Sequence, residues 1–225
     1  MEILKTADGS HTLFSKKFNE VYHSRHGSLQ ESNHVFIESG LNYFIQHNPL
    51  QKPISILEIG FGTGLNALLT MLYAEKNNVK IDYRTVEAFP VDIAVVKQLN
   101  YTELLGFEYC YGPYHTLHLC KWEDKHQVTP FFAFQKNKGE VQSSDSGQKH
   151  NIIYFDAFAP THQPELWTTE VFSKIYYSMS ENGILVTYCS KSIAQQAMRE
   201  AGFFIEKPVG PWGKREMIRA HKRPA

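Results

Sequence analysis

Short apolar runs alternate with amphipathic stretches from residue 54 to the end of this chain. The apolar runs are typical of buried β-strands, which we predict at 54–60, 80–88, 151–158 and 184–189. The amphipathic stretches put apolar side chains on one helical face, so we predict helices at 65–77, 92–105, 164–182 and 192–201. Two terminal strands are predicted at 203–207 and 215–220. This alternation indicates an α/β fold with a mainly parallel sheet covered by helices on both faces.

Two regions depart from this alternation. Residues 1–50 hold turn-prone polar segments and aromatic side chains. We expect them to form an N-terminal extension that packs over the edge or mouth of a sheet domain at 51–225. Residues 135–150 are almost devoid of apolar side chains, which predicts a long, mobile surface loop.

Length and composition indicate one soluble globular domain. A chain of 225 residues, 42% hydrophobic and 20% charged, can bury a sizeable core. Basic and acidic residues balance at 23 each, so binding to nucleic acid would require a local basic patch.

The cysteines and the apolar runs indicate a reducing compartment. Cys110, Cys120 and Cys189 show no CxxC spacing, which argues against a disulfide framework or a structural metal site. The N-terminus does not read as a signal peptide, and no run approaches the roughly 18 apolar residues of a membrane span. We therefore expect a cytoplasmic protein.

Three glycines at alternate positions, Gly60, Gly62 and Gly64, follow the first predicted strand. Such a loop permits unusual backbone angles and close approach to a nucleoside-bearing cofactor, although it can also be a plain strand–helix turn. A dinucleotide fingerprint places its third glycine five positions after the first, whereas here the separation is four. The spacing, with Glu58 two residues before the loop, favours S-adenosylmethionine over NAD.

Two further acids end predicted strands. Glu87 lies 23 residues after the last glycine, where an acid can accept hydrogen bonds from ribose hydroxyls. Asp156 ends the run NIIYFD and should face the same crevice, because ligands of open α/β sheets bind at the carboxyl ends of strands. We predict that Asp156 orients an acceptor amine and stabilises the cation formed on methyl transfer. Each acid could instead be an ordinary strand-end or turn residue.

Aromatic and basic residues are candidates for substrate contacts. Phe158 and Trp167 could wall the acceptor pocket by stacking, while Trp167 could equally belong to the core. The C-terminal run GKREMIRAHKRPA is basic and could contact nucleic-acid phosphates through residues such as Lys214 and Arg215, or be a solvated tail. The HxxH pairs at 23/26 and 115/118 lack further ligands, so we expect no metal.

Several motifs together resemble a known family. They are FNEVYHSRHGSLQESNHVFI, GFGTGLN, VEAFP, DAFAP, PELW and GPWGKREM. The chain resembles, from about Ser15 to Ala220, the methyltransferase of tRNA 5-methylaminomethyl-2-thiouridine biosynthesis, without the oxidase domain fused to it in bifunctional relatives. The resemblance implies a Rossmann-like class I methyltransferase fold with an antiparallel C-terminal strand. It also implies S-adenosylmethionine as donor and the aminomethyl group of a tRNA wobble uridine as acceptor.

The resemblance also assigns roles to residues. Asp156 carries over to catalysis. The donor-site residues are Glu58, Gly60, Phe61, Gly62, Thr63, Gly64, Asn66 and Glu87. The family's glycine–acid pair near the adenine has Gly139-Glu140 as its candidate here.

Other functions fit the same residues. One is an S-adenosylmethionine-dependent transferase that acts on a small-molecule amine and has no tRNA surface. Another is an NAD-dependent oxidoreductase, which the glycine spacing disfavours. A non-catalytic nucleotide-binding module would leave Asp156 without a role.

Overall fold

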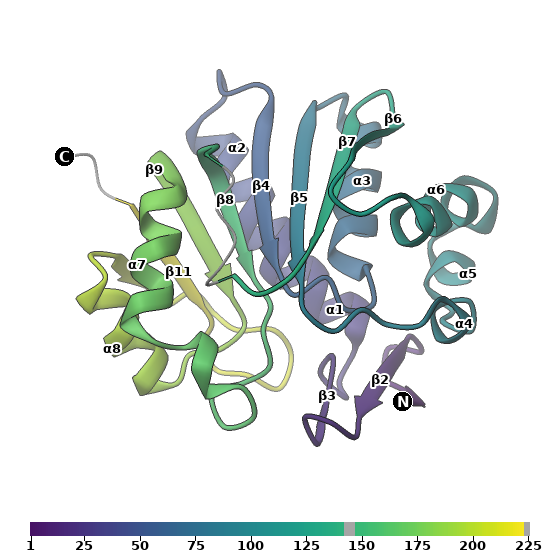
Figure 1. Cartoon of the computed structure of the whole chain (residues 1–225), viewed down its shortest axis with the longest axis horizontal. Coiled ribbons are helices and arrows are strands. Elements are labelled where there is room, and N and C mark those ends of the chain that lie inside the picture. The colour runs from purple at the N-terminus through teal and green to yellow at the C-terminus, as the bar shows by residue number, and fades with distance from the viewer. Residues whose placement is uncertain (142–146, 223–225) are drawn as a thin grey trace.

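The computed structural model, which describes residues 1–141 and 147–222, is built around an eight-stranded sheet (Figure 1). Its strand order is β10-β11-β9-β8-β4-β5-β7-β6. The strands are β4 (Ile54–Ile59), β5 (Ile81–Glu87), β6 (Lys125–Thr129), β7 (Phe132–Lys138), β8 (His150–Phe155), β9 (Met179–Thr187), β10 (Phe204–Glu206) and β11 (Ile218–His221). The run from β9 to β7 is parallel, while β11 is antiparallel to β9 and β6 to β7. The predicted fold class, including its antiparallel C-terminal strand, is confirmed.

Helices cover the sheet on both faces. They are α1 (Ser28–Ser32), the π-helix η1 (Asn33–Asn42), α2 (Tyr43–His47), α3 (Leu65–Asn77), α4 (Ile93–Val96), α5 (Tyr101–Leu105), α6 (Phe107–Leu119), the 3-10 turn η2 (Pro164–Leu166), α7 (Thr169–Ser178) and α8 (Ser192–Glu200). Alternate strand residues such as Ile56 and Tyr154 pack with η1, α3 and α6, whereas Leu57 and Phe155 pack with α7 and α8. This period of two follows from the pleat of a strand whose two faces are both buried.

The N-terminal extension contributes to the same core. Its strands β1 (Glu2–Lys5), β2 (His11–Ser15) and β3 (Glu20–Val21) form a small antiparallel sheet past the carboxyl ends of β4 and β5 (Figure 1). The helical segment that follows was not predicted, and it buries Val35, Phe36, Leu41 and Phe44 against the central sheet. Residues 28–47 are therefore part of the same body as the central sheet.

Two predicted helices have different bounds. The helix predicted at 92–105 is broken into α4 and α5, separated by a turn. The one predicted at 164–182 ends at Ser178, because Met179 pairs with His150 and opens β9. Gly183 lies inside that strand and is not a helix stop, so pairing in the sheet outweighs the helical periodicity of the sequence.

The predicted polar loop at 135–150 is also shorter than expected. Its first residues belong to β7, where they pair with β5, and the side chain of Lys136 is only 1% exposed. Its last residue, His150, opens β8. The stretch 142–146 lies outside the described residues. Within the described part of the chain, no helix is long and apolar enough to cross a membrane.

Candidate active site

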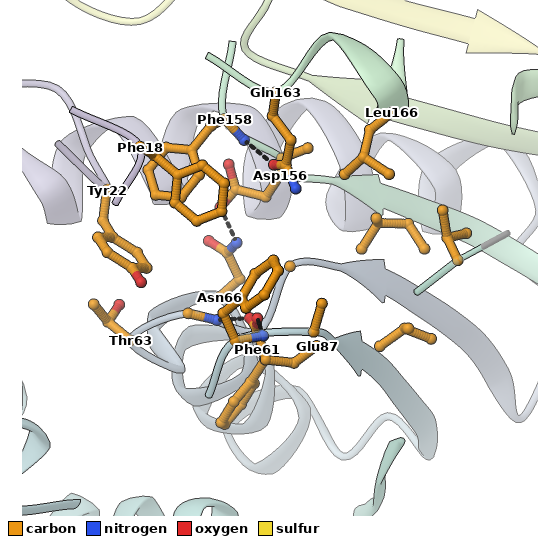
Figure 2. A pocket seen from close by; sticks show the side chains of 18 of the residues that line it. Phe18, Tyr22, Phe61, Thr63, Asn66, Glu87, Asp156, Phe158, Gln163 and Leu166 are labelled. Carbon is orange, nitrogen blue, oxygen red and sulfur yellow. Dashed lines mark hydrogen bonds between the residues drawn. The ribbon is translucent and has the colours of Figure 1, made fainter. Parts of the chain in front are cut away.

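A pocket opens at the carboxyl ends of β4, β5 and β8 (Figure 2). It encloses about 970 Å³ including its open mouth. The chain leaves β4 towards β5 on one side, while β8 continues to β9 on the other, so the pocket lies at the topological switch point of the sheet. The lining comes from the β4–α3 loop, the ends of β5 and β7, the segment after β8 and the N-terminal extension.

The glycine loop has a backbone that disfavours other residues. Gly60, Gly62 and Gly64 have φ angles of 92°, 50° and 75°. A Cβ at Gly60 would lie 2.7 Å from the carbonyl oxygen of Asp156, and one at Gly64 would lie 2.6 Å from Nε2 of His118. We expected the missing Cβ atoms to make room for a cofactor. At Gly60 and Gly64 the protein itself fills that space.

Helix α6 supports this loop from below. The Tyr114 hydroxyl donates to the carbonyl oxygen of Thr63 at 2.7 Å, and Nε2 of His118 lies 3.2 Å from the same oxygen. Burial, followed by the charge of Lys136, lowers the pKa of His118 to about 3, so its ring is neutral at pH 7. Because its partner is a carbonyl oxygen, the proton is assigned to Nε2. Sequence reasoning missed α6, which holds the loop in place.

Glu87 presents a fixed carboxylate to the pocket. One of its oxygens accepts from the backbone nitrogen of Gly62 at 2.9 Å, and the other accepts from that of Phe89 at 2.7 Å. Glu87 is 9% exposed and lines the pocket. A carboxylate oxygen has more than one lone pair, so these bonds leave capacity to accept from two hydroxyls of a ligand.

Asp156 follows β8 and belongs to a hydrogen-bonded row of three side chains. Asn66 donates through Nδ2 to Asp156 at 2.8 Å and to Glu58 at 3.1 Å (Figure 2 shows the first of these bonds). Burial raises the pKa of Asp156 to about 7; the Asn66 hydrogen bond and Lys214 oppose the rise, and the charge of Glu31 adds to it. Asp156 therefore changes its charge near neutral pH.

Glu58 does not reach the pocket surface. Its side chain is 0% exposed and lies beneath Asn66, and burial followed by the charge of Asp156 holds its pKa well above the usual range. We therefore correct its expected position. Its hydrogen bond from Asn66 connects Glu58 to the site.

An aromatic wall bounds the pocket beside Asp156. The rings of Phe18 and Phe158 stack with centroids 4.6 Å apart, and Tyr22 meets Phe158 edge-on at 5.0 Å. Figure 2 shows these rings on the same side of the pocket as Asp156. Trp167, which we expected either as a second wall or as part of the core, is only 2% exposed and donates from Nε1 to the carbonyl oxygen of Phe158 at 2.7 Å. It supports the wall from behind, in the core.

The remaining predicted residues divide between pocket and surroundings. Phe61, Thr63 and Glu140 line the pocket. Lys214 forms an ion pair with Glu31 and lies over the ring of Tyr188, 3.9 Å from its centroid. The lining residues that sequence reasoning did not assign include Phe18, Tyr22, His23, Gln163 and Tyr188. Phe18, Tyr22 and His23 belong to the N-terminal motif FNEVYH, which could have pointed to them.

The basic C-terminal run does not form one patch. Arg215 is exposed, but Arg219 pairs with Glu206 at 2.8 Å and Lys222 pairs with Glu181 at 3.0 Å. Because β11 runs antiparallel to β9, it carries Lys222 towards the opposite end of the sheet. Arg223 lies outside the described residues. Among those described, no cluster of histidine, cysteine and acidic side chains could hold a metal ion.

Sequence comparisons connect this pocket with methyl transfer. A family model described as "S-adenosyl-L-methionine-dependent methyltransferase" matches residues 122–223. The chain is 30% identical over 221 residues to the tRNA 5-methylaminomethyl-2-thiouridine biosynthesis bifunctional protein MnmC of Leptospira interrogans, with 92% of this chain and 33% of the relative covered. It is 28% identical to MnmC of Nitrosospira multiformis, with 92% and 34% covered. The chain thus spans about a third of the length of these curated relatives.

The fold has a matching solved structure. MNMC2 from Aquifex aeolicus superposes with a TM-score of 0.77 at 24% identity, covering 100% of this chain and 70% of the other. The family description identifies S-adenosylmethionine, and not NAD, as the cofactor. Residues 122–223 thus match a family of S-adenosylmethionine-dependent methyltransferases, and 92% of the chain is similar to about a third of the tRNA 5-methylaminomethyl-2-thiouridine biosynthesis proteins MnmC.

Proposed function

We propose that this protein methylates the nitrogen of a 5-aminomethyl group on the wobble uridine of tRNA, with S-adenosylmethionine as donor. The observation that carries the proposal is Asp156, a half-buried carboxyl beside the glycine loop and the aromatic wall. The names of the MnmC relatives supply the acceptor. A cytoplasmic location, where tRNA is modified, is part of the proposal.

The pocket has groups that fit the proposed donor. Glu87 offers lone pairs to a pair of ribose hydroxyls, and Gly60, Phe61, Gly62 and Thr63 line the pocket beside it. Glu140 lines the same pocket and is our candidate for contact near the adenine. When bound, the donor supplies a methyl group on a positively charged sulfur.

Asp156 would act on the acceptor. The amine nitrogen uses its lone pair to bond to the methyl carbon while the carbon–sulfur bond breaks with its electrons on sulfur. The product is a protonated secondary amine, whose extra proton passes to solvent water. Only a neutral amine has this lone pair. Ionised Asp156 can accept a hydrogen bond from the amine, aim its lone pair and stabilise the positive charge that develops on nitrogen. Asn66 fixes the carboxylate for this task.

The aromatic wall suits a planar acceptor. The stacked rings of Phe18 and Phe158 line the pocket together with Asp156, and single-stranded bases in RNA loops are bound by stacking on such rings. Lys214 and Arg215 remain our candidates for contact with the acceptor RNA, since their segment borders the pocket through Tyr188.

The test is methylation by the purified protein. We expect transfer of a radiolabelled methyl group to tRNA that carries 5-aminomethyluridine, and nucleoside mass spectrometry should identify 5-methylaminomethyluridine as the product. Fully modified tRNA is the matched control substrate. Methylation of a small amine such as a polyamine, with none of the tRNA, would contradict the proposal in favour of the small-molecule alternative.

A variant tests the role of Asp156. Asp156→Ala removes the group that aims the amine, so we expect the rate of transfer to fall by about 10²- to 10⁴-fold. Donor binding, measured by calorimetry, should change little, because Asp156 contacts Asn66 and not the Glu87 side of the loop. Transfer at close to the wild-type rate would refute the mechanism.

A further inference from the structure

An exposed tryptophan stands on a fixed turn near the pocket. Trp212 is 64% exposed, although tryptophan is usually well buried. Its turn is closed by hydrogen bonds from the backbone nitrogen of Gly210 to the carbonyl oxygen of Arg215 at 3.2 Å and from that of Lys214 to Pro211 at 2.8 Å. The exposed indole is therefore carried by a turn with a defined, hydrogen-bonded backbone.

The same turn is attached to the N-terminal extension. The backbone nitrogen of Trp212 donates to Oε1 of Gln30 at 3.3 Å, and the indole stacks on the ring of His26 with centroids 5.9 Å apart and planes at 28°. Gly213 has a φ of 85°, and a Cβ there would lie 2.3 Å from the His26 ring. The two rings thus form a preset double platform.

The two segments that carry the platform, around Trp212 and around His26, each contain a residue at the active-site pocket. Lys214, two residues after Trp212, lies over the pocket residue Tyr188. His23, three residues before His26, lines the pocket itself. The two rings of the platform thus lie two and three residues along the chain from Lys214 and His23, which contact or line the pocket.

Charge at the platform favours a polyanion. Arg25 and Arg215, which flank the two rings in sequence, are both exposed. Neither takes part in an ion pair within the described part of the chain. Exposed arginines next to an aromatic face are the chemistry that binds the phosphates and bases of single-stranded nucleic acid.

We propose that Trp212, backed by His26, stacks on a nucleobase adjacent to the nucleotide being methylated, while Arg25 and Arg215 contact the neighbouring phosphates. This inference rests on the proposed function and adds a second recognition point outside the pocket. Stacking tolerates any base, so the platform holds the RNA loop open and does not select its sequence.

Fluorescence tests the stacking directly. A short single-stranded RNA with an anticodon-loop sequence should quench the emission of the wild type, and it should quench Trp212→Ala, which keeps Trp122 and the buried Trp167, much less. Trp212→Ala should weaken binding of this RNA about tenfold in an anisotropy assay, whereas Trp212→Phe should retain most of the affinity. The control is Tyr177→Ala, which removes a 71% exposed aromatic side chain from the end of α7, away from the pocket.

Kinetics separate this inference from the proposed function. On 5-aminomethyluridine tRNA, Trp212→Ala should raise KM about tenfold with little change in kcat, and donor binding should be unchanged. Equal RNA affinity and equal KM in Trp212→Ala and the wild type would overturn the platform while leaving the proposed function intact. Failure of the wild type to methylate the tRNA would instead overturn the proposed function.

Discussion

At the scale of single residues, the unusual group is Asp156. Burial raises the pKa of its carboxyl from 3.8 to about 7, so the folded protein binds its proton more tightly than the unfolded chain does. The sign follows from linkage: the carboxyl contributes most to stability below pH 4, and that contribution is lost as pH rises towards 7. At neutral pH the ionised carboxyl of Asp156 therefore lowers the stability of the folded protein.

Asp156→Asn should remove the stability cost of ionising this buried carboxyl. The amide has no charge to bury, so Tm should rise above that of the wild type by about a few degrees at pH 8. The gain should grow between about pH 4 and pH 7 and stay constant above. Thermal denaturation across this range measures it, with the exposed Asp124→Asn as control. A gain that does not vary with pH would contradict the raised pKa of Asp156.

At the scale of elements, strand and helix periodicity predicted the parts whose structure is locally encoded. The helix at 65–77 has the bounds of α3, and the strand at 54–60 is β4 within one residue. Helix α6 was missed because it contains Pro113 and its side chains are mostly aromatic and polar, whereas its position in the structure comes from packing on α3, α5 and β6. The start of β9 was missed for a similar reason, since its pairing with His150 is not visible locally.

The α6–loop contact gives a prediction at this scale. Gly64→Ala would place a Cβ against His118 at a φ of 75°, so we expect Tm to fall by several degrees and donor affinity to fall with it. Gly202→Ala is the matched control, because it has a φ of 100° but no atom closer than 3.6 Å and lies at the end of α8. It should lower Tm with donor affinity unchanged. Equal donor affinity in the two variants would argue against the support of the glycine loop by helix α6.

At the scale of the whole molecule, the N-terminal extension and the C-terminal turn meet over the pocket. Their link is the ion pair between Glu31, 5% exposed, and Lys214, and Glu31 also accepts from the backbone nitrogen of Ser24 at 2.9 Å. No local pattern could reveal a contact between residues so far apart in the chain. The glycine loop and Asp156 could be located from sequence, and so could the segment at 1–50 that was expected to cover them, but its individual contacts could not.

Glu31→Gln tests this link. It leaves the Lys214 ammonium without a carboxylate in a partly buried place, which should cost about 1–3 kcal/mol of unfolding free energy in urea denaturation. Glu216→Gln is the control, because its pair with Lys207 at 3.4 Å is far more exposed and should cost less than about 1 kcal/mol. Equal losses in the two variants would mean that the Glu31 pair is an ordinary surface contact.

The space around the glycine loop can be enlarged at one of its three glycines but not at the other two. Around Gly60 the space is taken by backbone, and around Gly64 by a buried imidazole, so neither side can be widened without disturbing β8 or α6. Around Gly62 the nearest atoms belong to the side chain of Tyr22, at 3.0 Å. To accommodate bulkier donor analogues, Tyr22 is therefore the first residue to replace with a smaller side chain. It belongs to the N-terminal extension and not to the central sheet.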